Sequence, residues 1–399
     1  MTKTATRQQA QRDSHLTHTV NMDLWLLIPI LLLLACGLIM VGSASIAIAE
    51  SQNVSTNYYL LRHLIYILLG LMLAATFRVI PIGLLERISR PLMWLSALLL
   101  LLVFIPGIGH SVNGSVRWIS LGVANFQVVE IVKVMVIIYT AGYLVRKAEM
   151  VKTRFFDTLK PLLLAAMLTL LLLAQPDMGS AAIITAIVAG MVWLAGAAWR
   201  HILMLGMLVL PVFGYAAMEP YRLKRIVSFM NPWSDPFNSG FQLTQALIAV
   251  GRGEIFGVGL GASIQKLFYL PEAHTDFIFA VLAEEFGLLG VVFILSLFML
   301  LVARIMIIGL MAHRAGRPFA GNLAYGTGLW IGLQSMVSIG VNLGVLPTKG
   351  LTLPLISSGG SSLLMTLLAL GMVFRIRYEL DRDTPLKVTR RPNTAGVRR

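Results

Sequence analysis

The chain has 399 residues, of which 57% are hydrophobic and only 13% are charged. This composition excludes a single water-soluble domain, whose surface must stay wettable, and a disordered chain; one cysteine, Cys36, excludes a disulfide framework. The net charge of +14 comes from basic residues that lie between apolar runs, which indicates membrane topology and no nucleic-acid partner.

Ten apolar runs follow one another along the chain, and a helix that crosses a bilayer needs about 20 such residues. We therefore predict an all-α polytopic membrane protein with about ten transmembrane helices. They form one membrane domain over residues 21–378, flanked by tails at 1–20 and 379–399. The runs are 24–42, 62–80, 91–106, 126–145, 161–174, 180–198, 202–217, 277–303, 322–346 and 354–374.

The Lys and Arg residues predict the orientation of these helices. If the amino terminus is cytoplasmic, 23 of the 32 basic side chains fall on the cytoplasmic side of the membrane. Cytoplasmic loops carry an excess of Lys and Arg, so we expect both termini in the cytoplasm.

The longest loop, residues 218–276 between the seventh and eighth predicted helices, falls on the outer side. It mixes aromatic residues, prolines and glycines densely, which indicates an ordered and functional loop. Within it, 241–250 has the pattern of a short amphipathic helix lying in the membrane interface. The loop is also basic, so we expect an anionic partner, either lipid headgroups or a substrate. Its basic residues are Arg222, Lys224, Arg225, Arg252 and Lys266.

Asp276 comes just before the eighth predicted helix. A carboxylate at the membrane–water boundary is partly desolvated, which raises its pKa and makes it a better base. An aspartate at a helix start is equally a good N-cap, so the residues alone leave both roles open. In the same segment, Glu272 is a candidate for substrate binding, and His274 is either a proton shuttle or a solvated loop histidine.

Two helices carry polar residues at helical spacing. Glu130 and Lys133 lie three residues apart on the fourth helix, so they share one face and can pair. Ionisable groups within a membrane are costly, and this pair is either a structural lock between helices or part of a site. Gln334, Ser338 and Asn342 are spaced by four on the ninth helix, a pattern typical of hydrogen bonding between helices.

Further candidates for anion binding are found in the predicted outer loops, and each of them also has a structural interpretation. Arg117 is either a headgroup anchor or an anion ligand, and Lys349 precedes a run of small residues near the last helix. Backbone N–H groups of such residues can cradle a phosphate, and the same small residues also allow tight helix packing. The small residues concerned are Ser357, Gly359 and Gly360.

The sequence contains no metal-binding, Walker or dinucleotide motif. Chemistry by this chain therefore needs an activated substrate that is delivered from the membrane. We expect the head of this substrate on the outer side, because the ionisable groups gather there. The segment 175–179 in the same region predicts a tight turn between two helices.

Six segments form a specific combination when they are taken together. They are Asn113-Gly-Ser-Val-Arg-Trp-Ile119, Gln175-Pro-Asp-Met-Gly179, Asn231-Pro-Trp-Ser-Asp-Pro236, Gly240-Phe-Gln-Leu-Thr-Gln245, Tyr269-Leu-Pro-Glu-Ala-His-Thr-Asp-Phe-Ile-Phe279 and Leu353-Pro-Leu-Ile-Ser357. With them the chain resembles the SEDS family (shape, elongation, division and sporulation) over residues 24–378. The amino-acid sequences of the segment around Asp276 and of residues 347–354 resemble those of the division members more than those of the elongation members.

The resemblance implies a peptidoglycan glycosyltransferase that polymerises lipid II during cell division. It implies a multi-pass protein of the bacterial inner membrane, at the division septum, with its active site facing the periplasm. Its expected partners are a class B penicillin-binding protein, which crosslinks the glycan and contacts the eighth and ninth helices, and other division membrane proteins. Division members usually read Ser-Tyr-Gly-Gly-Ser near the tenth helix, and Ser358 replaces that tyrosine here.

The family's essential aspartate matches Asp276, and its charged pair matches Glu130 and Lys133. The implied reaction is glycosyl transfer with inversion, in which Asp276 accepts the proton of the acceptor GlcNAc 4-hydroxyl. Undecaprenyl pyrophosphate leaves from the donor MurNAc, and cations hold its charge. A Mg²⁺ or Mn²⁺ ion can share that work, and the sequence leaves the metal open. The candidate cations are Lys349, Lys266, Arg117, Arg222 and Arg225.

Two other functions remain as alternatives at this stage. A lipid II flippase is built from a similar bundle, but it needs access from both leaflets and no base beside an acceptor. A non-catalytic division scaffold needs no site at all. The ionisable groups crowd the outer side, which favours the enzyme.

Overall fold

The computed structural model of the protein describes residues 23–383 except 113–114, 121 and 123–124. Several side chains between 202 and 222, that of Arg222 among them, also lie outside the described part. The predicted tail 1–20, most of the predicted tail 379–399, and two residues of the first resemblance segment therefore fall outside the description.

Each of the ten predicted runs corresponds to one long helix. The helices are α2 (Leu24–Ser51), α3 (Tyr58–Val79), α4 (Ile82–Leu102), α5 (Val128–Arg146), α7 (Phe155–Ala174), α8 (Met178–Leu194), α9 (Trp199–Ala217), α12 (Ile278–Arg314), α13 (Pro318–Asn342) and α14 (Gly360–Asp383). Among the described residues, five of them are long and apolar enough to cross a membrane, namely α2, α3, α5, α7 and α12. The helical membrane fold is confirmed, while the number of spans and their orientation stay predictions.

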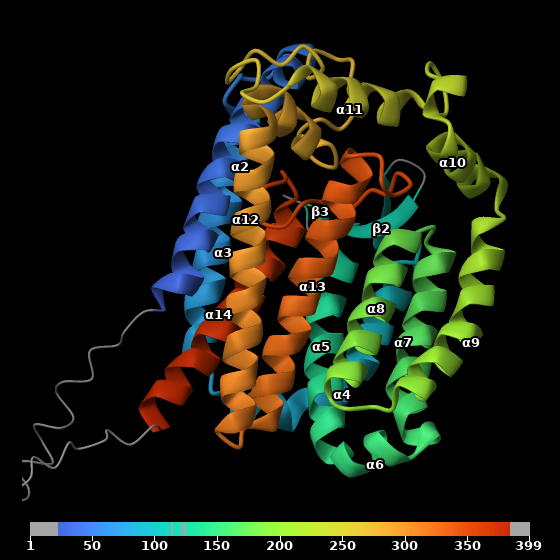
Figure 1. The fold of residues 1–399 in the computed structure, drawn as a ribbon, viewed down its shortest axis with the longest axis vertical. Helices are drawn as coiled ribbons and strands as arrows, with labels where there is room; N and C mark the ends of the chain where they lie inside the picture. The colour runs from blue at the N-terminus through green and yellow to red at the C-terminus, as the bar shows by residue number, and fades with distance from the viewer. Residues whose placement is uncertain (1–22, 113–114, 121, 123–124, 384–399) are drawn as a thin grey trace, which may run out of the picture.

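The helices form a bundle around α5, which is buried along nearly its whole length (Figure 1). In contrast, α3 is largely exposed, and its outward residues, such as Leu68 and Met72, are apolar. An apolar helix face that no other helix covers is what contact with lipid requires. A short helix, α6 (Ala148–Thr153), joins α5 to α7 at one end of the bundle.

The opposite end of the bundle carries the irregular structure. A small antiparallel sheet, in the order β1-β2-β3, lies between α4 and α5. Its strands are β1 (Gly109–Val112), β2 (Ser115–Ser120) and β3 (Asn125–Gln127). These strands were not predicted, because strands this short between Gly and Asn residues have the hydrophobic pattern of an irregular loop. The sheet holds Arg117 in its middle strand.

The long segment 218–276 is ordered, as predicted, and lies over the same end as the sheet (Figure 1). The predicted helix at 241–250 is confirmed as α11 (Phe241–Arg252). Two further elements, α10 (Pro220–Met230) and the 3₁₀ turn η1 (Pro232–Ser234), were not predicted. Of the basic residues of this segment, Lys224 and Arg225 lie on α10 and Arg252 lies on α11.

Helix α12 is interrupted at Gly287, which has φ 63° and ψ −161°. The turn after α11 fills the interruption: Val258 N–H donates to the Glu284 carbonyl (3.0 Å), and Leu288 N–H donates to the Glu254 carbonyl (2.9 Å). A Cβ on Gly287 would lie 2.4 Å from the backbone nitrogen of Gly257, so this contact requires glycine. The interruption thus ties the segment 218–276 to α12 through backbone hydrogen bonds.

The tenth predicted run, 354–374, is helical only from Gly360 onwards. Leu355 and Ile356 are buried, but in a loop that lies against Gly37 of α2, where a Cβ would come within 2.7 Å of the Leu355 carbonyl oxygen. A buried loop and a buried helix have the same apolar composition, which is why hydrophobicity misplaced this start. At its other end, α14 continues to Asp383, past the predicted domain end at 378.

Candidate active site

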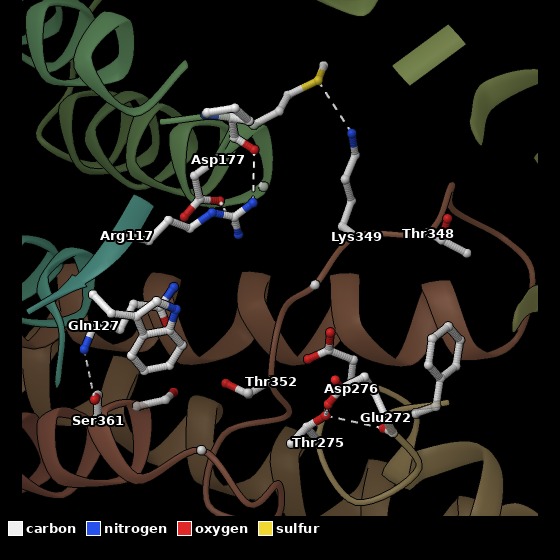
Figure 2. A pocket seen from close by; sticks show the side chains of 18 of the residues that line it. Arg117, Gln127, Asp177, Glu272, Thr275, Asp276, Thr348, Lys349, Thr352 and Ser361 are labelled. Carbon is white, nitrogen blue, oxygen red and sulfur yellow. Dashed lines mark hydrogen bonds and ion pairs between the residues drawn. The ribbon is translucent and has the colours of Figure 1, made fainter. Parts of the chain in front are cut away.

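A cavity of about 830 Å³ lies at the end of the bundle that carries the sheet and the outer loop. Its wall combines segments far apart in the sequence: β2, the turn before α8, α10, the turn before α12, and the loops before α14 (Figure 2). The charged residues that line it are Arg117, Asp177, Glu219, Arg225, Glu272, Asp276 and Lys349. The structure therefore brings together six of the predicted site residues: Arg117, Arg225, Glu272, Asp276, Lys349 and Gly359.

Asp276 is half-buried and its carboxylate faces the cavity (Figure 2). It does not cap α12, because the N-cap residue is Phe277 and no side chain of the cap bonds to the helix. Instead, Oδ1 of Asn342 accepts a hydrogen bond from Ala280 N–H (3.0 Å) in the first turn of α12. The capping alternative for Asp276 is therefore wrong, and its carboxylate is available to a bound molecule.

The surroundings of Asp276 shift its acidity. Burial raises the pKa of Asp276 to about 7, and the negative charge of Glu272 acts in the same direction. The guanidinium groups of Arg117 and Arg225 oppose this shift. A carboxyl group with a pKa near 7 can exchange a proton efficiently at neutral pH.

Three cationic side chains reach the cavity from three different elements. Arg117, on β2, donates through Nη2 to the Pro176 carbonyl (2.9 Å), and its Nη1 lies 3.7 Å from Oδ1 of Asp177. Arg225, on α10, donates through Nη1 to the Thr348 carbonyl (3.4 Å). Lys349 extends away from Asp276, and its ammonium lies 3.3 Å from Sδ of Met178 (Figure 2). This arrangement suits an anionic ligand that is larger than a single carboxylate.

Some of the small residues around the start of α14 line the cavity, as a phosphate cradle requires, and others serve tight packing. Gly359 and Ser358 line the cavity. Gly360 serves packing, since a Cβ there would lie 2.6 Å from the ring of Tyr66. Ser357 is structural as well: its hydroxyl donates to the Thr275 carbonyl (2.7 Å) and accepts from Leu353 N–H (2.8 Å).

His274 does not line the cavity, although its neighbours Thr275 and Asp276 do. Its ring packs against Tyr59, with 5.2 Å between the ring centroids, and its backbone carbonyl accepts from Ser358 N–H (3.1 Å). Burial lowers the pKa of His274. The interpretation as a solvated loop histidine is therefore wrong, and the ring is placed to support the turn that carries Asp276.

Lys266 lies outside the cavity, in a buried ion pair. Its ammonium donates to Oε1 of Glu285 (2.7 Å) and to Oγ of Ser43 (2.8 Å). Next to it, Glu284 binds Arg252 (3.0 Å) and accepts from Ser263 Oγ (2.5 Å). These two carboxylates, just before the interruption of α12, anchor the outer loop.

Glu130 and Lys133 are also buried and also lie outside the cavity wall. They form the predicted ion pair, with 2.9 Å between Nζ of Lys133 and Oε1 of Glu130. Lys133 donates further to Oε1 of Gln334 on α13 (2.7 Å). The pair therefore links α5 to α13, as the structural alternative requires. The predicted hydrogen bonding between helices is confirmed for Gln334 and Asn342 of the α13 stripe, whereas the Ser338 hydroxyl bonds to no described group.

Sequence reasoning missed several groups that line the cavity. Asp177 was interpreted as part of a turn; it caps α8 by accepting from Ser180 N–H (3.1 Å) and also pairs with Arg117. Gln127, Glu219 and Thr352 carry no sequence signal of their own, because only the fold brings them to the wall. Within the described residues, no three His, Cys, Asp or Glu side chains gather as a metal site, and the Mg²⁺ or Mn²⁺ ion stays a prediction.

The chain is similar to known proteins both in sequence and in structure. The probable peptidoglycan glycosyltransferase FtsW of Coxiella burnetii is 50% identical over 362 residues, covering 90% of this chain and 97% of that protein. The rod shape determining protein RodA of Thermus thermophilus has a similar structure, with a TM-score of 0.65 and 31% identity over 90% of this chain and 97% of that one.

A second solved chain belongs to a peptidoglycan synthase complex that coordinates polymerization and crosslinking. It covers 91% of this chain and 99% of its own length, with a TM-score of 0.73 and 31% identity. The model of the FtsW, RodA and SpoVE cell cycle proteins matches residues 24–382, nearly the whole described part. This chain therefore belongs to the FtsW/RodA/SpoVE family of cell cycle proteins, which confirms the resemblance to the SEDS family.

Proposed function

We propose that this protein is a peptidoglycan glycosyltransferase that joins lipid II units into β-1,4-linked glycan strands during cell division. Close relatives carry that name, at about half identity over most of the chain. The observation that carries the proposal is one cavity lined by Asp276, with a pKa of about 7, and by three cationic side chains. A base and an anion-binding wall are the two parts that this transfer needs.

The reaction divides between these two parts. The Asp276 carboxylate accepts the proton of the acceptor GlcNAc 4-hydroxyl, and that oxygen forms a bond to the anomeric carbon of the donor MurNAc. The bond from this carbon to the pyrophosphate oxygen breaks, and undecaprenyl pyrophosphate leaves with the electron pair. The donor linkage is α and the polymer linkage is β, so a single displacement with inversion suffices. Arg117, Arg225 and Lys349 stabilise the charge of the departing pyrophosphate.

The same comparison supports a setting in the inner membrane. A multi-pass protein of the inner membrane has its lipid-linked substrate in the bilayer, and we propose that the cavity faces the periplasm at the division septum. The similar solved chain belongs to a peptidoglycan synthase complex. We propose a corresponding complex with a class B penicillin-binding protein, which crosslinks the strands, and contacts with other division membrane proteins. The predicted contact helices are α12 and α13 (Figure 1).

The test is direct: purified protein, with and without the crosslinking partner, is incubated with labelled lipid II and the products are separated on a gel. We expect a ladder of glycan strands. Transfer of the labelled headgroup across a vesicle, with no ladder, would instead identify a flippase. If the folded protein with its partner present gives neither a ladder nor transfer of the headgroup, only the non-catalytic scaffold remains.

The pH dependence of the polymerisation rate tests the role of Asp276. The base must be deprotonated, so we expect the rate to fall about tenfold per pH unit below the pKa of Asp276, about 7, and to level off above it. The variant Glu272→Gln removes a neighbouring negative charge that raises this pKa, so its acidic limb should lie at lower pH. An unchanged limb in this variant would contradict the assignment of the limb to Asp276.

A further inference from the structure

A buried chain of polar side chains runs from α5 to the wall of the cavity. Lys133 donates to Oε1 of both Glu130 (2.9 Å) and Gln334 (2.7 Å), and Trp330 Nε1 also donates to Oε1 of Gln334 (2.7 Å). The ammonium of Lys133 lies 4.9 Å from the centre of the Trp330 ring, a cation–π contact. None of these four side chains lines the cavity, and each is almost fully buried.

This chain fixes the orientation of the Gln334 amide. Its oxygen accepts from two donors, Lys133 and Trp330, so its NH₂ group must point the other way. There Nε2 donates to the Thr352 carbonyl (3.0 Å). Rotating the amide by 180° would place NH₂ against two other donors, an arrangement that a buried site does not tolerate. Lys133 and Trp330 together therefore decide that Gln334 presents a donor to Thr352.

Thr352 lines the cavity and lies three residues after Lys349, on the same loop as Gly350 (Figure 2). That loop passes close to Asp276, since a Cβ on Gly350 would lie 3.1 Å from Oδ2 of Asp276. A hydrogen bond that holds Thr352 thus holds the loop that carries Lys349.

The same helix also holds the proposed base. Asn342 lies two turns after Gln334 on α13 and is fully buried. Its Nδ2 donates to the Asp276 carbonyl (2.9 Å), and its Oδ1 accepts from Ala280 N–H (3.0 Å). One rigid helix therefore ties down both cavity walls, the Asp276 turn through Asn342 and the Lys349 loop through Gln334.

We propose that the Glu130–Lys133 pair is a positioning device: it acts through Gln334 to hold the Lys349 loop in register with Asp276 and does not contact the substrate. The proposal rests on the proposed function, because it assigns a role within that reaction. A displacement of about 1 Å between reacting groups can cost about 100-fold in rate, so a buried relay of this kind affects catalysis without touching the substrate.

A double-mutant cycle on polymerisation tests it. The first variant, Glu130→Gln with Lys133→Met, removes both charges so that no buried charge is left unpaired. The second, Gln334→Met, removes the amide, and the third combines all three changes. We expect each of the first two to lower kcat/KM by up to about 100-fold and the combination to be no worse than Gln334→Met alone. Multiplied losses in the combination would show that the pair acts independently of Gln334 and would overturn the proposal.

A charge-matched variant separates positioning from ion pairing. In Glu130→Gln with Gln334→Glu, one carboxylate still faces Lys133 and Trp330, but position 334 has no donor for the Thr352 carbonyl. We expect kcat/KM to stay low although the ion pair is kept; recovery to the wild-type value would contradict a role for the Thr352 hydrogen bond. Ser338→Ala is the control on the same helix, because the Ser338 hydroxyl bonds to no described group, and it should retain wild-type activity.

Thermal unfolding of each variant completes the test. The proposal requires a loss of kcat/KM in protein that is folded at the assay temperature. Wild-type kcat/KM in folded Gln334→Met protein, with only the unfolding temperature lowered, would reduce the relay to a structural role and overturn the inference. Failure of the wild-type protein itself to make polymer would sink the proposed function, which is a separate result.

Discussion

Replacing Asp276 with asparagine should lower polymer formation from lipid II by about 10²- to 10⁴-fold, the range that a general base contributes. Asparagine has nearly the same shape, but its amide cannot accept the proton of the acceptor hydroxyl. The backbone contacts of this residue, including the hydrogen bond from Asn342 to its carbonyl (2.9 Å), remain available to asparagine. The measurement is the initial rate of glycan formation by purified protein, at a pH above 7.

The folding control for this variant is its unfolding temperature, and the pKa of Asp276 predicts how this temperature differs from the wild type as the pH changes. The pKa of Asp276 in the folded protein, about 7, lies above its ordinary value of 3.8, so its contribution to stability is full below about pH 4 and is lost as the pH rises through 7. Asp276→Asn does not ionise, so its unfolding temperature should match the wild type near pH 4 and exceed it above pH 7. Normal polymer formation by this stable variant would remove Asp276 as the base.

Replacing Lys266 with methionine should destabilise the fold by about 3–5 kcal/mol, the usual cost of leaving a buried charge without its partner. Glu285 is fully buried at the end of the first part of α12, and Lys266 is its cation, at 2.7 Å. The loss should appear as a lower unfolding temperature. Activity should fall with it, because this pair anchors the loop that leads to Asp276.

The paired variant Lys266→Met with Glu285→Gln separates this anchoring role from substrate binding. It removes both charges, so we expect it to recover most of the stability and most of the polymerisation activity. If Lys266 instead bound the pyrophosphate of the substrate, as the sequence analysis proposed, the paired variant would regain stability but remain poorly active.

The membrane fold was accessible from the sequence because it depends on composition over long windows. A run of about 20 apolar residues can satisfy its backbone hydrogen bonds in lipid only as a helix. Each run from 24–42 to 354–374 therefore corresponds to one helix, although the last helix begins only at Gly360. The same reasoning failed in the outer region. The strands β1 to β3 and helix α10 are short, and their hydrophobic pattern does not differ from that of a loop.

The candidate site was likewise predictable from the sequence only in part. Asp276, Arg117, Arg225, Lys349 and Glu272 were named from the sequence, and they line one cavity. Lys266 was named with them, yet the fold gives its ammonium to Glu285. In the sequence, Lys266 and the cations that line the cavity all lie in polar segments between apolar runs. Only the packing of α2 and α12 decides that Lys266 is buried with a carboxylate.

By itself, the sequence determined the class of protein, the helical segments, the family and the residue types available for chemistry, because each of these depends on local composition or motif. The tertiary structure alone decided which ionisable groups meet. Asp276 does not cap α12 because Asn342, from another helix, takes that place, and Glu130 with Lys133 faces Gln334 and not the cavity. Hydrogen bonds and ion pairs act over about 3 Å, whereas the partners here lie tens to hundreds of residues apart in the chain, so only the folded bundle assigns them.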